Sequence, residues 1–162
     1  MMIKKHVQTY RRIYQRTVNV LMPVIYTFLF SYAWYTGLTN FVHAFVNKGN
    51  IMIIVLYFVI SYVALKVWNA FGIGMQKLVN VVVSQAMGVL FCNMVIFFQL
   101  FLIAGDIKYL EGISFYMFWT TIYQWIFAVV FPYIFNLIYI HIFPPHRSRA
   151  VGPMLITPLS RN

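Results

Sequence analysis

Long hydrophobic stretches without a charged residue alternate with short charged segments along the chain. Four such stretches are present, at 17–47, 49–65, 78–105 and 112–146. A helix that crosses a bilayer needs about 20 predominantly apolar residues, at a rise of about 1.5 Å per residue. The second stretch reaches this length only when it includes Lys66, whose aliphatic stem can carry its ammonium group to the membrane interface. The pattern therefore predicts four transmembrane helices.

We expect an all-α membrane protein with an up-down four-helix bundle, because the connecting segments are short and short connections favour antiparallel neighbours. The expected helices cover approximately 18–40, 51–71, 79–104 and 113–143. Residues 1–17 are expected to form a basic interfacial segment before this transmembrane domain, which covers residues 18–143. Residues 144–162 are expected to form an unstructured cytoplasmic tail.

The composition indicates that the bilayer, rather than water, surrounds most of the chain. Hydrophobic residues make up 62% of the 162 residues and charged residues only 9%, whereas soluble domains average about 25% charged residues. A soluble domain of this length could not cover its surface with so few charges. The formal net charge of +10 raises the question of nucleic acid. Because the charges lie between the hydrophobic stretches, we expect no nucleic-acid partner.

The basic residues are divided unevenly between the two sides of the predicted bundle. One side holds those of the N-terminal segment, of the connection between the second and third helices, and of the C-terminal tail: Lys4, Lys5, Arg11, Arg12, Arg16, Lys66, Lys77, Arg147, Arg149 and Arg161. The other side holds Lys48 and Lys108, together with both acidic residues, Asp106 and Glu111. Because Lys and Arg are retained on the cytoplasmic side, we expect both termini in the cytoplasm.

The N-terminal segment has an apolar and a basic face when drawn as a helix. Lys5, Arg12 and Arg16 share one face, and apolar and aromatic residues recur on the other at three- and four-residue spacing. Such a segment attracts anionic lipid head groups by about 1 kcal/mol for each Lys or Arg. It either contacts head groups in general or recognises one phospholipid or polyprenyl phosphate. The candidate phosphate contacts are Arg12, Arg16 and Lys77.

Polar and small residues inside the predicted helices favour helix packing over ligand binding. Ser84, Gly88 and Cys92 recur at four-residue intervals in the third helix, and such a small-residue stripe lets a neighbouring helix approach closely. The third helix also carries the amides Gln85, Asn93 and Gln99, and we expect them to form hydrogen bonds between helices. The fourth helix carries Thr120, Thr121, Gln124 and Asn136. Its Pro132 removes an internal hydrogen bond that Thr or Gln side chains or a neighbouring helix can replace. None of the four predicted helices contains an acidic residue, which argues against ion-coupled transport.

Aromatic residues near the predicted helix ends are typical of interfacial anchors. By this argument Trp34 and Tyr35 mark the outer interface, and Trp68 marks the inner one.

No set of residues has the spacing of a catalytic or metal-binding motif. The chain has a single cysteine, Cys92, and its four histidines fall on different segments. No paired carboxylates, nucleophile–base pair or glycine-rich phosphate loop is present, and the Gly72-Ile73-Gly74 sequence indicates a tight turn. We expect no cofactor, no metal and no catalytic residue in this chain.

Four local sequences together resemble the N-terminal membrane region of bacterial polyprenyl glycosylphosphotransferases, the exopolysaccharide sugar transferases that attach a sugar phosphate to undecaprenyl phosphate. They are KGN at 48–50, FGIG at 71–74, SQ at 84–85 together with Asn93, and NLIYIHIFPP at 136–145. The resemblance covers roughly residues 10–146, in order and spacing. It implies a multi-pass protein of the bacterial cytoplasmic membrane that acts in exopolysaccharide or capsule synthesis.

The resemblance ends just after Pro145. Members of this family continue into a cytoplasmic nucleotide-binding-like domain and then a catalytic domain, whereas only 17 residues remain here. The chain therefore resembles the membrane half of a sugar transferase without its catalytic half, as a result of truncation, of a frameshift or of a genuine split into two chains. We expect an anchoring and assembly domain that is inactive alone. It would act as a homo-oligomer or with a separate catalytic subunit. The alternative is a small four-helix flippase for lipid-linked sugars, or a transporter subunit.

Overall fold

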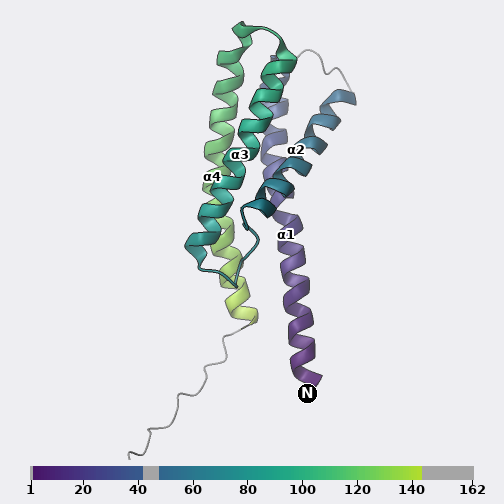
Figure 1. The fold of residues 1–162 in the computed structure, drawn as a ribbon, viewed down its shortest axis with the longest axis vertical. Coiled ribbons are helices and arrows are strands. Elements are labelled where there is room, and N and C mark those ends of the chain that lie inside the picture. The colour runs from purple at the N-terminus through teal and green to yellow at the C-terminus, as the bar shows by residue number, and fades with distance from the viewer. Residues whose placement is uncertain (1, 42–47, 144–162) are drawn as a thin grey trace, which may run out of the picture.

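The chain is built from four α-helices and two short 3-10 helices (Figure 1). The computed structural model describes residues 2–41 and 48–143, with side chains for 8–41 and 51–143. The elements are α1 (Met2–Thr36), η1 (Leu38–Asn40), α2 (Lys48–Val67), α3 (Leu78–Ala104), η2 (Ile107–Tyr109) and α4 (Leu110–Ile142). No strand occurs within these ranges, so the expected all-α class is confirmed for them.

Consecutive helices run in opposite directions, and α3 and α4 lie side by side along most of their length (Figure 1). The start of α1, the connection at 68–77 and the end of α4 lie toward one end of the bundle, which we call the basic end. η1 and η2 lie at the other end, which we call the η end. α2 crosses the bundle obliquely.

Three helical segments of the described chain are long and apolar enough to cross a membrane, which is the pattern of a membrane protein. They are Gln8–Thr36, Leu78–Ala104 and Ile107–Ile142. The apolar part of α2, Ile51–Val67, has 17 residues and falls short of that length. The prediction of a fourth transmembrane helix therefore stays a prediction.

The first helix begins 16 residues earlier than the expected 18–40. α1 runs without interruption from Met2, so the basic N-terminal segment continues the apolar helix along the same axis. Contacts with the end of α4 stabilise this arrangement. The Tyr14 hydroxyl donates to the Phe135 carbonyl at 2.7 Å, and the Arg11 guanidinium lies 5.9 Å from the ring centroid of Tyr139. The predicted tail at 144–162 lies outside the described residues.

α2 and the connection that follows also differ from the prediction. The expected second helix, 51–71, is observed at Lys48–Val67. Asn69 has φ of 53°, a left-handed conformation that ends a helix. The Gly72 carbonyl then accepts hydrogen bonds from the amides of Met75 and Gln76, at 3.0 and 2.9 Å. The predicted tight turn at 72–74 is confirmed.

The core is formed by α1 residues at three- and four-residue spacing that face the other helices. Tyr26, Phe30 and Trp34 are fully buried, and the Phe30 ring stacks on that of Tyr57 in α2, with centroids 4.1 Å apart. The expectation that Trp34 anchors the helix at the interface is wrong, because its side chain has no exposed surface. Its neighbour Tyr35 is exposed. Hydropathy did not show which of Trp34 and Tyr35 is buried, because both faces of this helix are apolar.

α3 lies close to α2 at Gly88. A Cβ atom added there would lie 3.2 Å from Leu65 Cδ2 and 3.4 Å from Leu65 Cα. Within the predicted small-residue stripe, Gly88 and Cys92 are buried, and Ser84 is half-buried. The stripe therefore lies against the bundle, and Gly88 is the position at which the absence of a side chain matters.

We expect Gly88→Val to destabilise the bundle by about 1–3 kcal/mol, the usual cost of overpacking a filled interface. Gly88→Ala should cost less, because a single methyl group requires Leu65 to move by only a few tenths of an ångström. The thermal unfolding temperature in detergent micelles measures this loss. Met87→Val on the exposed side of the same turn is the matched control. Equal losses for Gly88→Val and Met87→Val would contradict a close approach at Gly88.

Candidate functional site

A network of buried polar side chains lies in the middle of the bundle. Asn93 of α3 is its centre. Its Oδ1 accepts from the Tyr57 hydroxyl at 2.7 Å, and its Nδ2 donates to Thr121 Oγ1 and Gln124 Oε1, both at 2.8 Å. The Gln124 amide in turn donates to the Tyr57 hydroxyl at 2.8 Å. The side-chain amide of Asn93 in α3 therefore connects this helix to α2 and α4.

The network continues to α1 through Gln124 and Tyr26. Gln124 Nε2 donates to the Tyr26 carbonyl at 3.0 Å, and the Tyr26 hydroxyl donates to Gln85 Oε1 at 2.9 Å. Gln85 Nε2 donates to the Ala70 carbonyl at 3.3 Å. The chain of bonds thus also reaches the connection after α2, so that all four helices share one set of hydrogen bonds.

Sequence reasoning identified part of this network and missed the rest. The amides Gln85 and Asn93 were expected to bond between helices, and the structure confirms this. Gln124 was noted only as a polar residue of the fourth helix, and its bonds to three other helices were not expected. The tyrosines Tyr26 and Tyr57 were not identified. The sequence feature that could have identified them is their position, far from either end of a charge-free stretch. A tyrosine hydroxyl at such a position lies in hydrocarbon and needs a hydrogen-bond partner.

The candidate phosphate contacts lie toward the basic end. Arg12 and Arg16 are exposed on α1, and Lys77 is exposed immediately before α3. All three are accessible to lipid head groups, although the structure holds them on two different elements. Arg11, which was not a candidate, instead packs over the aromatic rings of Tyr139 and Phe143.

Positive and negative side chains are more nearly equal in number at the η end than at the basic end. Lys108 Nζ lies 2.9 Å from Asp106 Oδ2, and the Lys108 amide donates to Asp106 Oδ1 at 3.0 Å. The side-chain hydrogen bond from Lys108 holds the pKa of the Asp106 carboxyl below its usual value. Lys108 therefore has a carboxylate partner.

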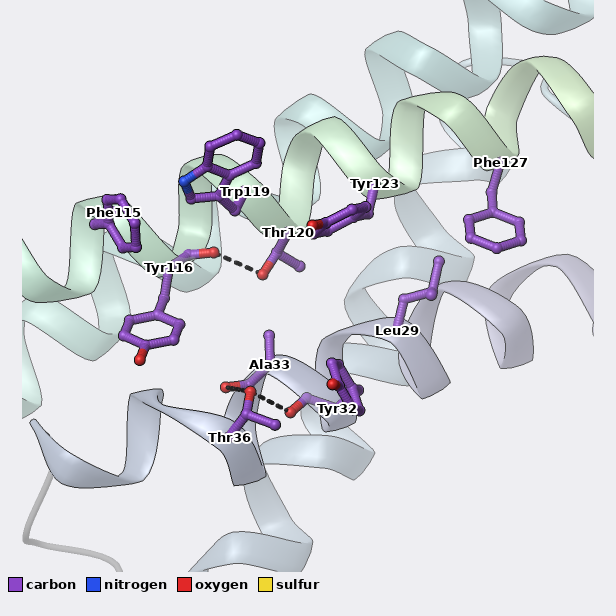
Figure 2. A pocket seen from close by; sticks show the side chains of 10 residues that line it. All are labelled: Leu29, Tyr32, Ala33, Thr36, Phe115, Tyr116, Trp119, Thr120, Tyr123 and Phe127. Atoms are coloured by element: carbon purple, nitrogen blue, oxygen red, sulfur yellow. Dashed lines mark hydrogen bonds between the residues drawn. The ribbon is translucent and has the colours of Figure 1, made fainter.

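A groove opens between α1 and α4 in the half of the bundle near the η end (Figure 2). It encloses about 460 Å³ and is lined mostly by aromatic side chains from the two helices. The lining residues are Leu29, Tyr32, Ala33, Thr36, Phe115, Tyr116, Trp119, Thr120, Tyr123 and Phe127. Figure 2 shows side chains of α1 and α4 on opposite sides of the open space.

Within residues 2–41 and 48–143 the structure brings together no group of three or more His, Cys, Asp or Glu side chains that could hold a metal ion. Cys92 is buried in the bundle.

Comparison with known proteins gives no relative: no family model, no curated protein and no solved structure matches the chain. The resemblance to polyprenyl glycosylphosphotransferases therefore stays a prediction from the sequence.

We expect Asn93→Leu to destabilise the protein by about 1–3 kcal/mol. The substitution removes three hydrogen bonds, each worth on the order of 0.6 kcal/mol inside a membrane, and leaves the Tyr57 hydroxyl with fewer partners. Unfolding by a denaturing detergent in mixed micelles measures the loss. Gln99→Leu is the matched control, because this half-buried amide of α3 lies outside the network.

A second measurement separates the network from a packing defect. Tyr57→Phe removes one hydroxyl and keeps the ring stacked on Phe30. Since Tyr57 and Asn93 share a hydrogen bond, the two substitutions should be non-additive. Tyr57→Phe should cost less in the Asn93→Leu background than alone, where it also removes the bond to Asn93. Additive losses would show that the two side chains do not act together.

Proposed function

We propose that the chain is the membrane-anchoring and assembly domain of a sugar transferase that resembles bacterial polyprenyl glycosylphosphotransferases. In this role it holds a cytoplasmic catalytic unit at the membrane, near a polyprenyl-phosphate lipid, and has no transferase activity alone. The observation that carries the proposal is the hydrogen-bond network centred on Asn93, which joins all four helices.

The network supports an anchoring role because the buried polar side chains bond with one another and so hold the helices together. Asn93 and Gln124 both donate and accept within the network, and Gln85 bonds with Tyr26 and Ala70. Side chains that satisfy one another in this way stabilise one arrangement of the helices. Such a bundle is suited to holding an attached or docked unit in a fixed position.

The distribution of charge supports an orientation. The exposed basic side chains Arg12, Arg16, Lys66 and Lys77 lie toward the basic end, whereas Lys108 at the η end is paired with Asp106. By the positive-inside rule the basic end faces the cytoplasm. α4 also ends there, so a catalytic unit at this end would lie beside anionic head groups.

Single-cysteine labelling tests this topology and the number of transmembrane helices. Cys92→Ala provides a cysteine-free chain, and Asn40, Gln76 and Ile107 are exposed positions for new cysteines. In intact bacterial cells, a membrane-impermeant maleimide should label Asn40→Cys and Ile107→Cys. It should label Gln76→Cys only after the membrane is permeabilised. Labelling of Asn40→Cys and Gln76→Cys from the same side would show that α2 does not cross.

The activity assay uses the purified chain in nanodiscs with undecaprenyl phosphate and a nucleotide sugar. We expect no transfer of sugar phosphate by the chain alone, and retention of undecaprenyl phosphate that falls in the Arg12→Glu, Arg16→Glu, Lys77→Glu triple variant. Lys108→Glu at the η end is the control and should leave retention unchanged. Robust transfer by the purified chain, or retention unaffected by the triple variant, would contradict the proposal.

A further inference from the structure

The groove between α1 and α4 is long and narrow, with its length along the helices. Its lining extends over eight residues from Leu29 to Thr36 on α1, or about 10 Å, and over thirteen from Phe115 to Phe127 on α4, or about 18 Å. A bundle that crosses a bilayer has its helices roughly along the membrane normal, so the groove points in the direction in which lipid chains lie.

The lining changes in polarity along the groove. Thr36 and Tyr116 lie at the end near η1, and Leu29 and Phe127 lie at the deep end. The Thr36 hydroxyl donates to the Tyr32 carbonyl at 2.8 Å, and the Thr120 hydroxyl donates to the Tyr116 carbonyl at 2.7 Å. These hydroxyl protons are used within their own helices, so the deep part of the groove offers mainly apolar surface.

The groove is open on the side that faces away from the bundle. Tyr32, Phe115 and Tyr123 line it and remain 69%, 59% and 54% exposed. α1 and α4 both contain segments able to cross a membrane, so this opening faces the hydrocarbon of the bilayer. Water in an apolar groove at that depth would lack hydrogen-bond partners. The molecule available to fill the space is a lipid chain.

We propose that the groove binds one acyl chain of a membrane phospholipid, with the head group at the η end and the methyl end toward Leu29 and Phe127. This inference is independent of the proposed role in sugar transfer, because it rests on the shape and lining of the groove. A helix of a second copy lies in the same direction, but at about 10 Å across it reaches the groove only with individual side chains, whereas a lipid chain can lie along its whole length. Because Lys108 at this end is paired with Asp106, we expect zwitterionic and anionic phospholipids to bind alike.

The test uses the full chain in nanodiscs of phosphatidylethanolamine and phosphatidylglycerol that carry a diazirine group on one acyl chain. After illumination, mass spectrometry locates the crosslinks. We expect labelling of Tyr116, Trp119 and Tyr123 to exceed that of Phe98, an α3 residue that is 62% exposed. Either labelled phospholipid should give the same pattern.

Substitutions that fill the groove provide the decisive comparison. Ala33→Phe places a ring in the groove and should lower labelling of Tyr116, Trp119 and Tyr123 roughly tenfold, which corresponds to about 1.4 kcal/mol of binding. Val24→Phe adds the same ring to an exposed position of α1 and should leave this labelling unchanged. Leu29→Trp fills the deep end and replaces Ala33→Phe if that variant does not fold.

Three results would overturn the inference. The first is labelling of the groove no stronger than that of Phe98 and insensitive to both filling variants, which indicates ordinary surrounding lipid. The second is a crosslink between two copies of the chain through groove residues. The third is loss of the label on addition of undecaprenyl phosphate but not of unlabelled phospholipid, which would assign the groove to an isoprenoid chain.

Discussion

The side-chain amide of Asn93 is the interaction on which the rest of the bundle depends. In hydrocarbon a polar group without a partner is costly, and α3 places this amide where Tyr57, Thr121 and Gln124 surround it. Each bond fixes the rotation of one helix about its own axis, because only one face of that helix carries the partner. Gln124 extends the constraint to α1 through the Tyr26 carbonyl. Apolar packing alone would not select one rotation, since the lipid-facing sides of these helices are apolar as well.

The two ends of the α1–α4 pair differ because the network fixes only the middle. Toward the basic end, the Tyr14 hydroxyl bonds to the Phe135 carbonyl, and the rings of Tyr14 and Tyr139 lie 5.7 Å apart. Toward the η end, the same two helices border the groove, where Ala33 of α1 presents only a methyl group toward α4. On the basic side of Gln124 the pair is therefore closed by contacts between side chains. On the other side the two helices border the groove around Ala33, and they meet again where the Tyr116 ring lies against the backbone of Gly37 and 5.9 Å from the ring of Phe41.

Hydropathy and charge predicted the bounds of a long helix well where a charged residue or a turn residue stands at its end. α3 follows Lys77 and ends at Gly105, whose φ is 67°, and the observed bounds lie within one residue of the prediction. The start of α1 was missed because a basic segment and an apolar segment can share one helix, and only tertiary contacts such as Tyr14 with Phe135 keep them continuous.

The amides of the candidate site were predictable because they are rare in apolar helices. Tyr26 and Tyr57 were not, because a tyrosine can lie at an interface, in lipid or in a core. The family resemblance depends on short local sequences, which the fold does not test.

The groove and the network together indicate that the bilayer is part of this structure. A helix pair in a membrane gains little from excluding lipid, since lipid chains are as apolar as the side chains themselves. Its stability depends instead on hydrogen bonds and on filling space between the helices. The network provides the hydrogen bonds near Tyr26, whereas around Ala33 the side chains of α1 and α4 leave the groove between them. The proposed lipid chain supplies the contacts there, and a chain that lies along the helices makes the largest number of them.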